Sequence, residues 1–159
     1  MENIVTIEME NGKKIKIKLE PKAAPKTVEN FLKLVGEHFY DGLIFHRVIE
    51  NFMIQGGDPK GTGMGGSKDT IVGEFRANGI MNPLKHVRGA VSMARTQAPN
   101  SASSQFFIVH KDSLYLDGQY AAFGNVIEGI ETVDEIAAVK TDYNDRPITP
   151  QRIKTITIG

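Results

Sequence analysis

The sequence predicts a mainly β protein, a closed eight-stranded antiparallel β-barrel capped by two α-helices. Three observations lead to this prediction: an alternating hairpin at the start, a series of short apolar runs, and two stretches of helical spacing. Closure of the sheet would remove the unpaired edges that so many strands otherwise leave. No repeat, linker or low-complexity segment divides the chain, so we expect a single domain over residues 1–159.

The first twenty residues have the pattern of a β-hairpin. Apolar and polar side chains alternate over 5–10 and again over 14–19, and Asn11-Gly12 lies between the two runs. Asn-Gly tolerates the positive φ that a two-residue hairpin turn needs. We therefore expect two paired strands with one buried and one solvated face.

The two helices are expected on either side of a β-rich middle. Pro25 opens a stretch in which apolar residues recur at helical spacing from Val28 to Val35, and Gly36 marks its end. A second, short helix is expected at 131–139, followed by a strand at 152–158. Loops rich in glycine, asparagine and proline separate the intervening apolar runs, which are 43–49, 52–55, 90–94, 105–110 and 121–126.

The composition excludes several classes of function. Lys+Arg and Asp+Glu both number 19, and no basic stripe appears, so we expect no nucleic-acid partner. The chain has no cysteine, which removes disulfides and thiol chemistry and suits a reducing cytoplasm. Neither a leader peptide nor an apolar run of membrane-spanning length is evident, so we expect a cytoplasmic protein with no membrane partner.

One further motif lacks the context that its function requires, and two others are absent. Residues 61–66 satisfy G-x-G-x-x-G, yet a strand-like segment and not a helix follows, which argues against dinucleotide binding. The four histidines show no H-E-x-x-H spacing, and G-x-S-x-G is absent. We therefore expect no cofactor, no metal site and no serine hydrolase, and we interpret the glycine-rich segment as an irregular surface loop.

The unusual feature is a set of polar side chains inside apolar strands. Arg47 and Gln55 lie in the run 45–58, and Gln105 lies in the run 104–109. Strand alternation places Met53 beside Gln55, and Phe107 beside Gln105, on one face. An amide next to an apolar side chain suits a ligand that combines an apolar ring with a peptide backbone.

These segments resemble the cyclophilins, a family of peptidyl-prolyl cis–trans isomerases. The resemblance is carried by F-H-R-V-I-x-x-F-M-I-Q-G-G-D at 45–58, G-x-G-G at 63–66 and S-Q-F-F-I-V at 104–109, and it extends over essentially the whole chain. It implies an enzyme that accelerates rotation about X-Pro bonds and assists protein folding. It also implies a monomer whose partners are proline-containing peptides and unfolded or partly folded proteins. The alternative is a proline-peptide binding module or chaperone without catalysis.

The resemblance also implies roles for individual residues. Arg47 matches the family's catalytic arginine, and Gln55 matches an amide that orients it. The substrate-binding positions that it implies are Phe52, Met53, Gly63, Ala94, Arg95, Gln105, Phe107, Tyr115, Leu116 and Tyr120.

The chain departs from the family pattern at three of these positions. Tyr115 replaces a tryptophan, Tyr120 replaces a histidine, and Arg95 replaces a common asparagine. Because tyrosine can still cover a proline ring, we expect isomerase activity to survive. We expect cyclosporin binding to be weakened by Tyr115. Arg95 changes little if it contacts the peptide through its backbone.

Overall fold

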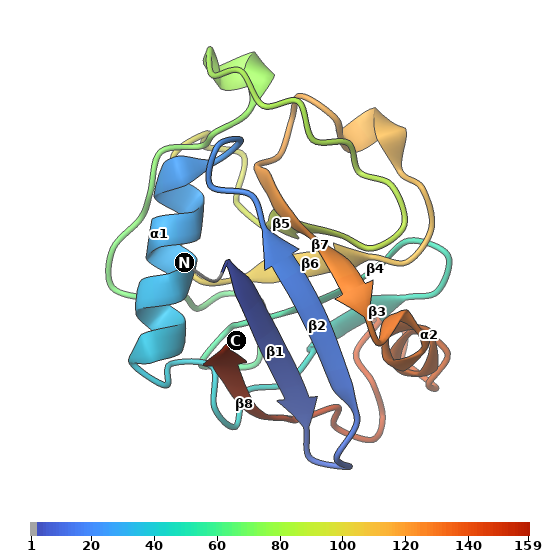
Figure 1. Ribbon diagram of the computed structural model, residues 1–159. Helices are drawn as coiled ribbons and strands as arrows, with labels where there is room; N and C mark the ends of the chain where they lie inside the picture. Colours follow the sequence, from blue (N-terminus) through green and yellow to red (C-terminus); the bar gives the residue numbers. More distant parts are fainter. Residues whose placement is uncertain (1–2) are drawn as a thin grey trace.

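The computed structural model describes residues 3–159 and contains one eight-stranded antiparallel sheet in the order β3-β4-β6-β5-β7-β2-β1-β8 (Figure 1). Met1 and Glu2 lie outside the described residues. They are the first two residues of the predicted domain and of the segment in which no leader peptide is expected. The strands are β1 (Ile4–Met9), β2 (Lys14–Leu19), β3 (Arg47–Ile49), β4 (Met53–Gly56), β5 (Ala90–Met93), β6 (Phe106–Val109), β7 (Ala122–Glu128) and β8 (Ile153–Ile158). The mainly β prediction is confirmed.

The predicted hairpin is the β1–β2 pair. Val5 lies opposite Ile17 and Ile7 opposite Ile15, and all four side chains are fully buried. The turn reverses at Gly12, whose φ of 87° is a left-handed conformation that glycine adopts without strain. Alternation alone was therefore enough to assign the two faces.

The prediction that the barrel is closed was wrong. β3 and β8 are the two edges of the sheet and do not pair with each other, so the sheet is an open half-barrel. Irregular segments lie between these two edges and accept hydrogen bonds from backbone N–H groups in and before β3. The Phe45 N–H donates to Gln151 O (2.9 Å), and the Val48 N–H donates to Asp145 O (2.8 Å). Because β3 has only three residues, coverage by loops replaces pairing as the protection of this edge.

The two predicted α-helices are present as α1 (Pro25–Gly36) and α2 (Ile130–Ala137), and two single 3₁₀ turns lie at Arg76–Asn78 and Leu114–Leu116. α1 begins at its proline, as expected. Its free N–H groups find an acceptor far along the chain, since the buried Glu74 carboxylate accepts from Thr27 N (2.7 Å) and Lys26 N (3.2 Å). A carboxylate there also opposes the positive end of the helix dipole. No helix among residues 3–159 has the length and apolar character of a membrane span.

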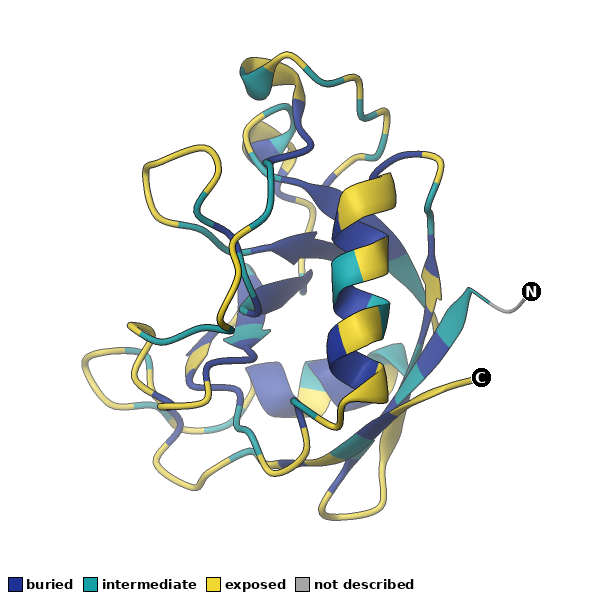
Figure 2. Cartoon of the chain, turned by 90° about the vertical axis from the view of Figure 1, so that its left-hand side faces the viewer, coloured by how far each residue is buried: buried dark blue, intermediate teal, exposed yellow. Residues whose placement is uncertain are grey.

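The buried side chains form two clusters on opposite faces of the sheet. Figure 2 shows that burial is concentrated in the strands, while the long connecting loops are largely exposed. Ile54, Phe106 and Ile108 belong to the large core, which α1 also contacts. Met53 and Phe107, their neighbours along β4 and β6, point the other way into a smaller cluster. That smaller cluster forms the floor of the groove described next.

Candidate functional site

The second face of the sheet carries a pocket of about 160 Å³ whose lining is apolar below and cationic at the rim. Met53, Phe107 and Leu116 supply its buried floor. Every residue that lines it was among the predicted site residues: Arg47, Phe52, Met53, Gln55, Ala94, Arg95, Phe107, Leu116 and Tyr120.

Arg47 lies opposite Gln55 in the β3–β4 pair, so the two side chains leave neighbouring strands on the same face. The Arg47 side chain is exposed at the pocket rim. Within residues 3–159 its guanidinium forms neither a side-chain hydrogen bond nor an ion pair. The guanidinium donors are therefore not used by the described residues and can bind a ligand.

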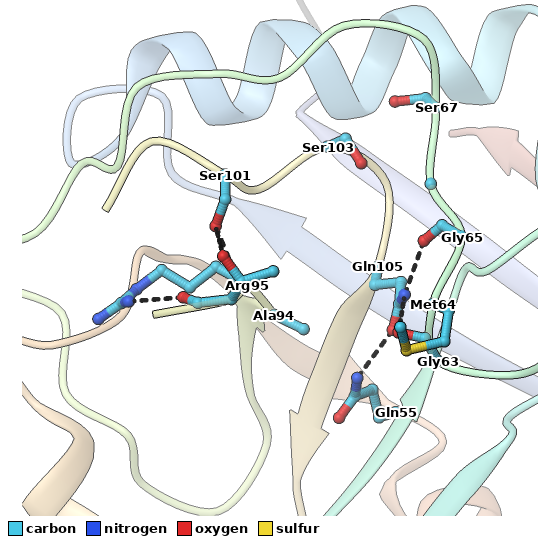
Figure 3. A pocket seen from close by; sticks show the side chains of 12 residues that line it. Gln55, Gly63, Met64, Gly65, Ser67, Ala94, Arg95, Ser101, Ser103 and Gln105 are labelled. Atoms are coloured by element: carbon cyan, nitrogen blue, oxygen red, sulfur yellow. Dashed lines mark hydrogen bonds between the residues drawn. The ribbon is translucent and has the colours of Figure 1, made fainter. Parts of the chain in front are cut away.

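Gln55 begins a chain of amide hydrogen bonds. Its Nε2 donates to Gln105 Oε1 (2.9 Å), and Gln105 Nε2 donates to the carbonyls of Gly65 (2.7 Å) and Gly63 (3.0 Å), as Figure 3 shows. Because Gln105 Nε2 must donate to the two carbonyls, Gln105 Oε1 is the acceptor and Gln55 Nε2 its donor. The side-chain carbonyl of Gln55, which lies on the strand opposite Arg47, is left as a free acceptor. The chain holds both glutamines in one orientation.

A second pocket, of about 260 Å³, adjoins the first across Gln55, Ala94 and Arg95 (Figure 3). Gly63 and Gln105 line this pocket and not the first one. Its other walls are the segment 64–67 and Thr96, Ser101 and Ser103. The two pockets together form a groove that is long enough to contact more than one residue of an extended peptide.

The glycine-rich loop is irregular and largely exposed, as expected, but it has an internal anchor. The buried Asp58 carboxylate accepts N–H bonds from Lys60, Thr62, Gly63 and Gly65 at 2.6–3.1 Å. Burial acts to raise the pKa of Asp58, but these four donors outweigh it and hold the pKa below its ordinary value. Since the loop N–H groups already bind a carboxylate of the chain, they are not available to cradle a phosphate.

The side chain of Arg95 is part of the groove and is held by several contacts. The guanidinium lies between the rings of Phe75 and Tyr120, 4.6 and 4.8 Å from their centroids. It donates to the carbonyls of Gln119 (2.6 Å from Nη2) and Thr96 (2.9 Å). Arg95 thus joins three loops around the groove, which an asparagine is too short to do.

The two tyrosines that replace family residues have different positions. Tyr120 lines the first pocket and packs edge-on against Phe107, with centroids 5.8 Å apart. Tyr115 lies outside that pocket, is 71% exposed, and stacks on Phe52 with centroids 6.1 Å apart. Tyr115 is therefore a rim residue and Tyr120 a wall residue.

A Ser–His–Asp chain that the sequence analysis missed supports the floor from below. His86 Nδ1 lies 2.8 Å from Asp117 Oδ1, and His86 Nε2 lies 2.9 Å from Ser92 Oγ. The imidazole stacks on Phe107 at 6.0 Å, and burial lowers the pKa of His86 against the opposing effect of Asp117. Ser92 is fully buried, so it cannot attack a substrate. No short-range spacing in the sequence indicated this chain, because 31 residues separate His86 from Asp117.

A second missed residue, His110, holds the turn that carries Phe52. The N–H of Asn51 donates to His110 Nδ1 (2.9 Å), and the opposite ring nitrogen lies 3.1 Å from Asp134 Oδ1. The His110 main-chain N–H also donates to Phe52 O (2.8 Å).

No group of three or more metal-ligating side chains occurs in the described part of the chain.

Comparisons with known proteins agree on one family. The family model described as cyclophilin type peptidyl-prolyl cis-trans isomerase matches residues 4–158. The chain is 44% identical to peptidyl-prolyl cis-trans isomerase ppi1 of Schizosaccharomyces pombe, over 88% of this chain and 89% of that protein. It is 45% identical to the human peptidyl-prolyl cis-trans isomerase-like 3, over 97% of this chain and 94% of that protein.

Solved structures give the same result. A cyclophilin-type isomerase of Cryptosporidium parvum superposes with a TM-score of 0.91 and 37% identity, covering 100% of this chain and 98% of that one. The structure of that protein in the presence of the dipeptide Ala-Pro superposes with a TM-score of 0.89, at 37% identity and 98% coverage of both chains.

Proposed function

Because the chain belongs to the cyclophilin-type peptidyl-prolyl cis–trans isomerases, we propose that Arg47 is its catalytic residue and that the pocket beside Arg47 receives the proline ring. The enzyme accelerates cis–trans rotation of X-Pro bonds in polypeptides. The observation that supports the proposal is a guanidinium without a partner in residues 3–159, placed at the rim of an apolar pocket.

The reaction needs no nucleophile, because no covalent bond is broken. Amide resonance imposes a barrier of about 18–20 kcal/mol, and uncatalysed exchange takes tens of seconds or longer. An acceleration of about 10⁵-fold requires a barrier lower by roughly 7 kcal/mol. The chain must therefore stabilise a twisted amide better than a planar one.

Arg47 can make that distinction through a hydrogen bond to the prolyl nitrogen. At the twisted transition state resonance is lost and this nitrogen regains its lone pair, so it accepts a hydrogen bond that it cannot accept when planar. A charged donor contributes about 1.5–3 kcal/mol net, and more where water is excluded. Arginine suits the role because it stays protonated and presents rigidly placed donors.

The apolar floor can supply a further part of the stabilisation. Met53, Phe107 and Leu116 are at most 8% exposed, and Phe52 and Tyr120 complete the wall around the ring. A twisted amide is less polar than a planar one and therefore tolerates this desolvated setting better. The carbonyl of Gln55, held by the amide chain on the strand opposite Arg47, would accept a hydrogen bond from the Arg47 side chain and orient it once a peptide is bound.

The remaining site residues would bind the peptide on either side of the proline. Ala94 and Arg95 offer backbone groups along the groove, Gln105 and Gly63 line the second pocket, and Tyr115 covers the rim beside Phe52. We also infer cyclosporin binding at the same groove, weakened because Tyr115 presents a smaller ring than tryptophan. The substrates we infer are proline-containing peptides and unfolded or partly folded proteins, bound by a single domain that acts as a cytoplasmic monomer.

A protease-coupled assay on an X-Pro peptide tests the catalytic role. We expect Arg47→Ala to lose at least 90% of kcat/KM while its thermal unfolding matches the wild type. Arg47→Lys keeps the charge but not the geometry, and we expect it to recover only a small part of the activity. Arg152→Ala, which removes an arginine that lines neither pocket of the groove, is the matched control and should retain full turnover.

The competing function, a proline-peptide binding module without catalysis, makes the opposite prediction. In that case wild type and Arg47→Ala would bind the peptide but neither would exceed the uncatalysed rate. Wild-type turnover in Arg47→Ala would refute the assignment of Arg47 while leaving the isomerase activity intact.

A further inference from the structure

The part of the groove around Arg95 combines two arginines with no acidic side chain in its lining; the hollow on the other side of Arg47 contains one carboxylate, Asp142, together with Arg146. Arg47 and Arg95 both line the first pocket, and Arg95 also lines the second pocket and a neighbouring hollow formed with Thr96, Gln97 and Tyr120. None of these three linings contains Asp or Glu. The chain as a whole has a formal net charge of zero, so the positive charge of the groove is local.

Arg95 keeps its charge uncompensated although its donors are well occupied. Nε and Nη2 donate to Gln119 O, and Nη1 donates to Thr96 O and Gln97 O. Carbonyl oxygens satisfy hydrogen bonds but carry no net negative charge. In residues 3–159 Arg95 has no ion pair, whereas Arg88, elsewhere on the surface, forms a bidentate pair with Asp134.

The position of this charge is fixed before a ligand arrives. The rings of Phe75 and Tyr120 enclose the guanidinium, and the carbonyls of three residues hold its edge. An arginine of this kind loses little side-chain entropy when an anion approaches, and its one remaining N–H, on Nη2, is free to donate. Electrostatic attraction to a carboxylate in the groove is therefore preorganised.

We propose that this isomerase prefers peptides with an aspartate or glutamate next to the proline, and that Arg95 is the residue that sets the preference. The proposal rests on the proposed function of the groove. Arg47 alone cannot account for a preference particular to this chain, because the resemblance places an arginine there throughout the family. Arg95 stands where many cyclophilins have an uncharged asparagine.

Matched peptides measure the preference directly. One pair has Glu or Gln immediately before the proline, and a second pair has Glu or Gln immediately after it. Exchange NMR of the cis and trans peptides gives kcat/KM without a coupling protease, whose own specificity would interfere. For the wild type at low salt we expect Glu to exceed Gln about three- to fivefold in at least one pair, the range of a partly exposed ion pair.

Variants then assign the preference to Arg95. In Arg95→Gln and in Arg95→Met, which keeps an apolar stem between the two rings, the Glu/Gln ratio should fall to about one. Arg95→Lys retains the charge and should retain most of the ratio. Lys154→Gln, which removes a positive charge on β8 at the other edge of the sheet, should leave the ratio unchanged. At 1 M salt the wild-type ratio should approach one, because screening shortens the Debye length to about 3 Å.

The readout is a ratio, so a general loss of activity in the Arg95 variants cancels. A wild-type ratio of one in both pairs at low salt, or a ratio that persists in the neutral variants, overturns the proposal. Failure of the proposed function gives a different result: the Gln peptides would then show no turnover by the wild type, or full turnover by Arg47→Ala.

Discussion

Replacing His110 by alanine tests how the turn that carries Phe52 is held. Asn51 has a φ of 68°, a conformation uncommon for a residue other than glycine, and its N–H donates to His110 Nδ1. Because Nδ1 is the acceptor, the neutral ring carries its proton on Nε2 and donates it to Asp134. The imidazole therefore connects the Asn51–Phe52 turn to α2.

The expected loss of stability follows from these two bonds. The bond from Asn51 is a neutral one, worth about 0.5–1.5 kcal/mol. The bond to Asp134 adds little, because that carboxylate is 40% exposed and is already held by both terminal nitrogens of Arg88. We expect His110→Ala to lower the free energy of unfolding by about 1–2 kcal/mol, which corresponds to a fall in Tm of roughly 3–6 °C for a chain of this size.

The effect on catalysis should appear mainly in KM. The turn positions Phe52 in the pocket wall, whereas Arg47 lies on β3 and does not contact His110 through any of these bonds. A displaced Phe52 mainly weakens contact with the proline ring, which is bound in both the planar and the twisted amide, while the buried floor that favours the twisted amide stays in place; KM should therefore rise while kcat changes less. His110→Asn places an amide oxygen where Nδ1 was, and it should recover most of the loss because it restores the acceptor for Asn51.

Three measurements decide the matter: urea unfolding, kcat and KM, and hydrogen exchange of the Asn51 amide. The amide should exchange faster in His110→Ala than in the wild type and should be protected again in His110→Asn. If His110→Ala unfolds within about 0.3 kcal/mol of the wild type and its Asn51 amide keeps full protection, the imidazole does not hold the turn and the reasoning fails.

Two further predictions concern acid sensitivity and the glycine-rich loop. Burial holds the pKa of His86 below its ordinary value of about 6.5. As the pH falls, the unfolded chain therefore takes up a proton at this residue before the folded chain does. The stabilisation that depends on neutral His86 is present above pH 6.5, and the free energy of unfolding should fall as the pH drops below that value. Urea unfolding between pH 7.5 and 5 measures how steeply the free energy of unfolding depends on pH. This dependence should be shallower in His86→Gln, and an equal slope in the two proteins would show that His86 is not its source. Gly65→Ala should destabilise the protein and raise KM, because a Cβ there overlaps Asp58 Oδ1 and displaces the carboxylate that anchors the loop. Gly36→Ala, at the end of α1 with no atom within 4 Å of the added Cβ, is its control, and equal behaviour of the two variants in unfolding and kinetics would show that the anchor is unimportant.

Local patterns in the sequence determined the elements and the faces of the strands. Alternation in β1 and β2 is sufficient to assign their buried sides, since a strand has a period of two and one face is fully buried. The same alternation placed Met53 and Gln55 together, and Gln105 and Phe107 together, on the groove side. The resemblance to the family then indicated every residue that lines the first pocket, and the structure places these residues around one cavity.

Tertiary structure decided the features that depend on residues far apart in the chain. Whether β3 pairs with β8 depends on how the segments around Phe45 and Gln151 fill the gap, and alternation carries no information about that. The partners of Thr27 on Glu74, of His86 on Asp117 and of Asn51 on His110 lie 31 to 59 residues away. The side chain of Arg95 is the clearest case: its sequence neighbours indicate a strand end, but only the approach of Phe75, Gln119 and Tyr120 turns it into a fixed charge at the groove. Hydrogen bonds and stacking act over a few ångströms, so they follow proximity in space and not spacing in the sequence.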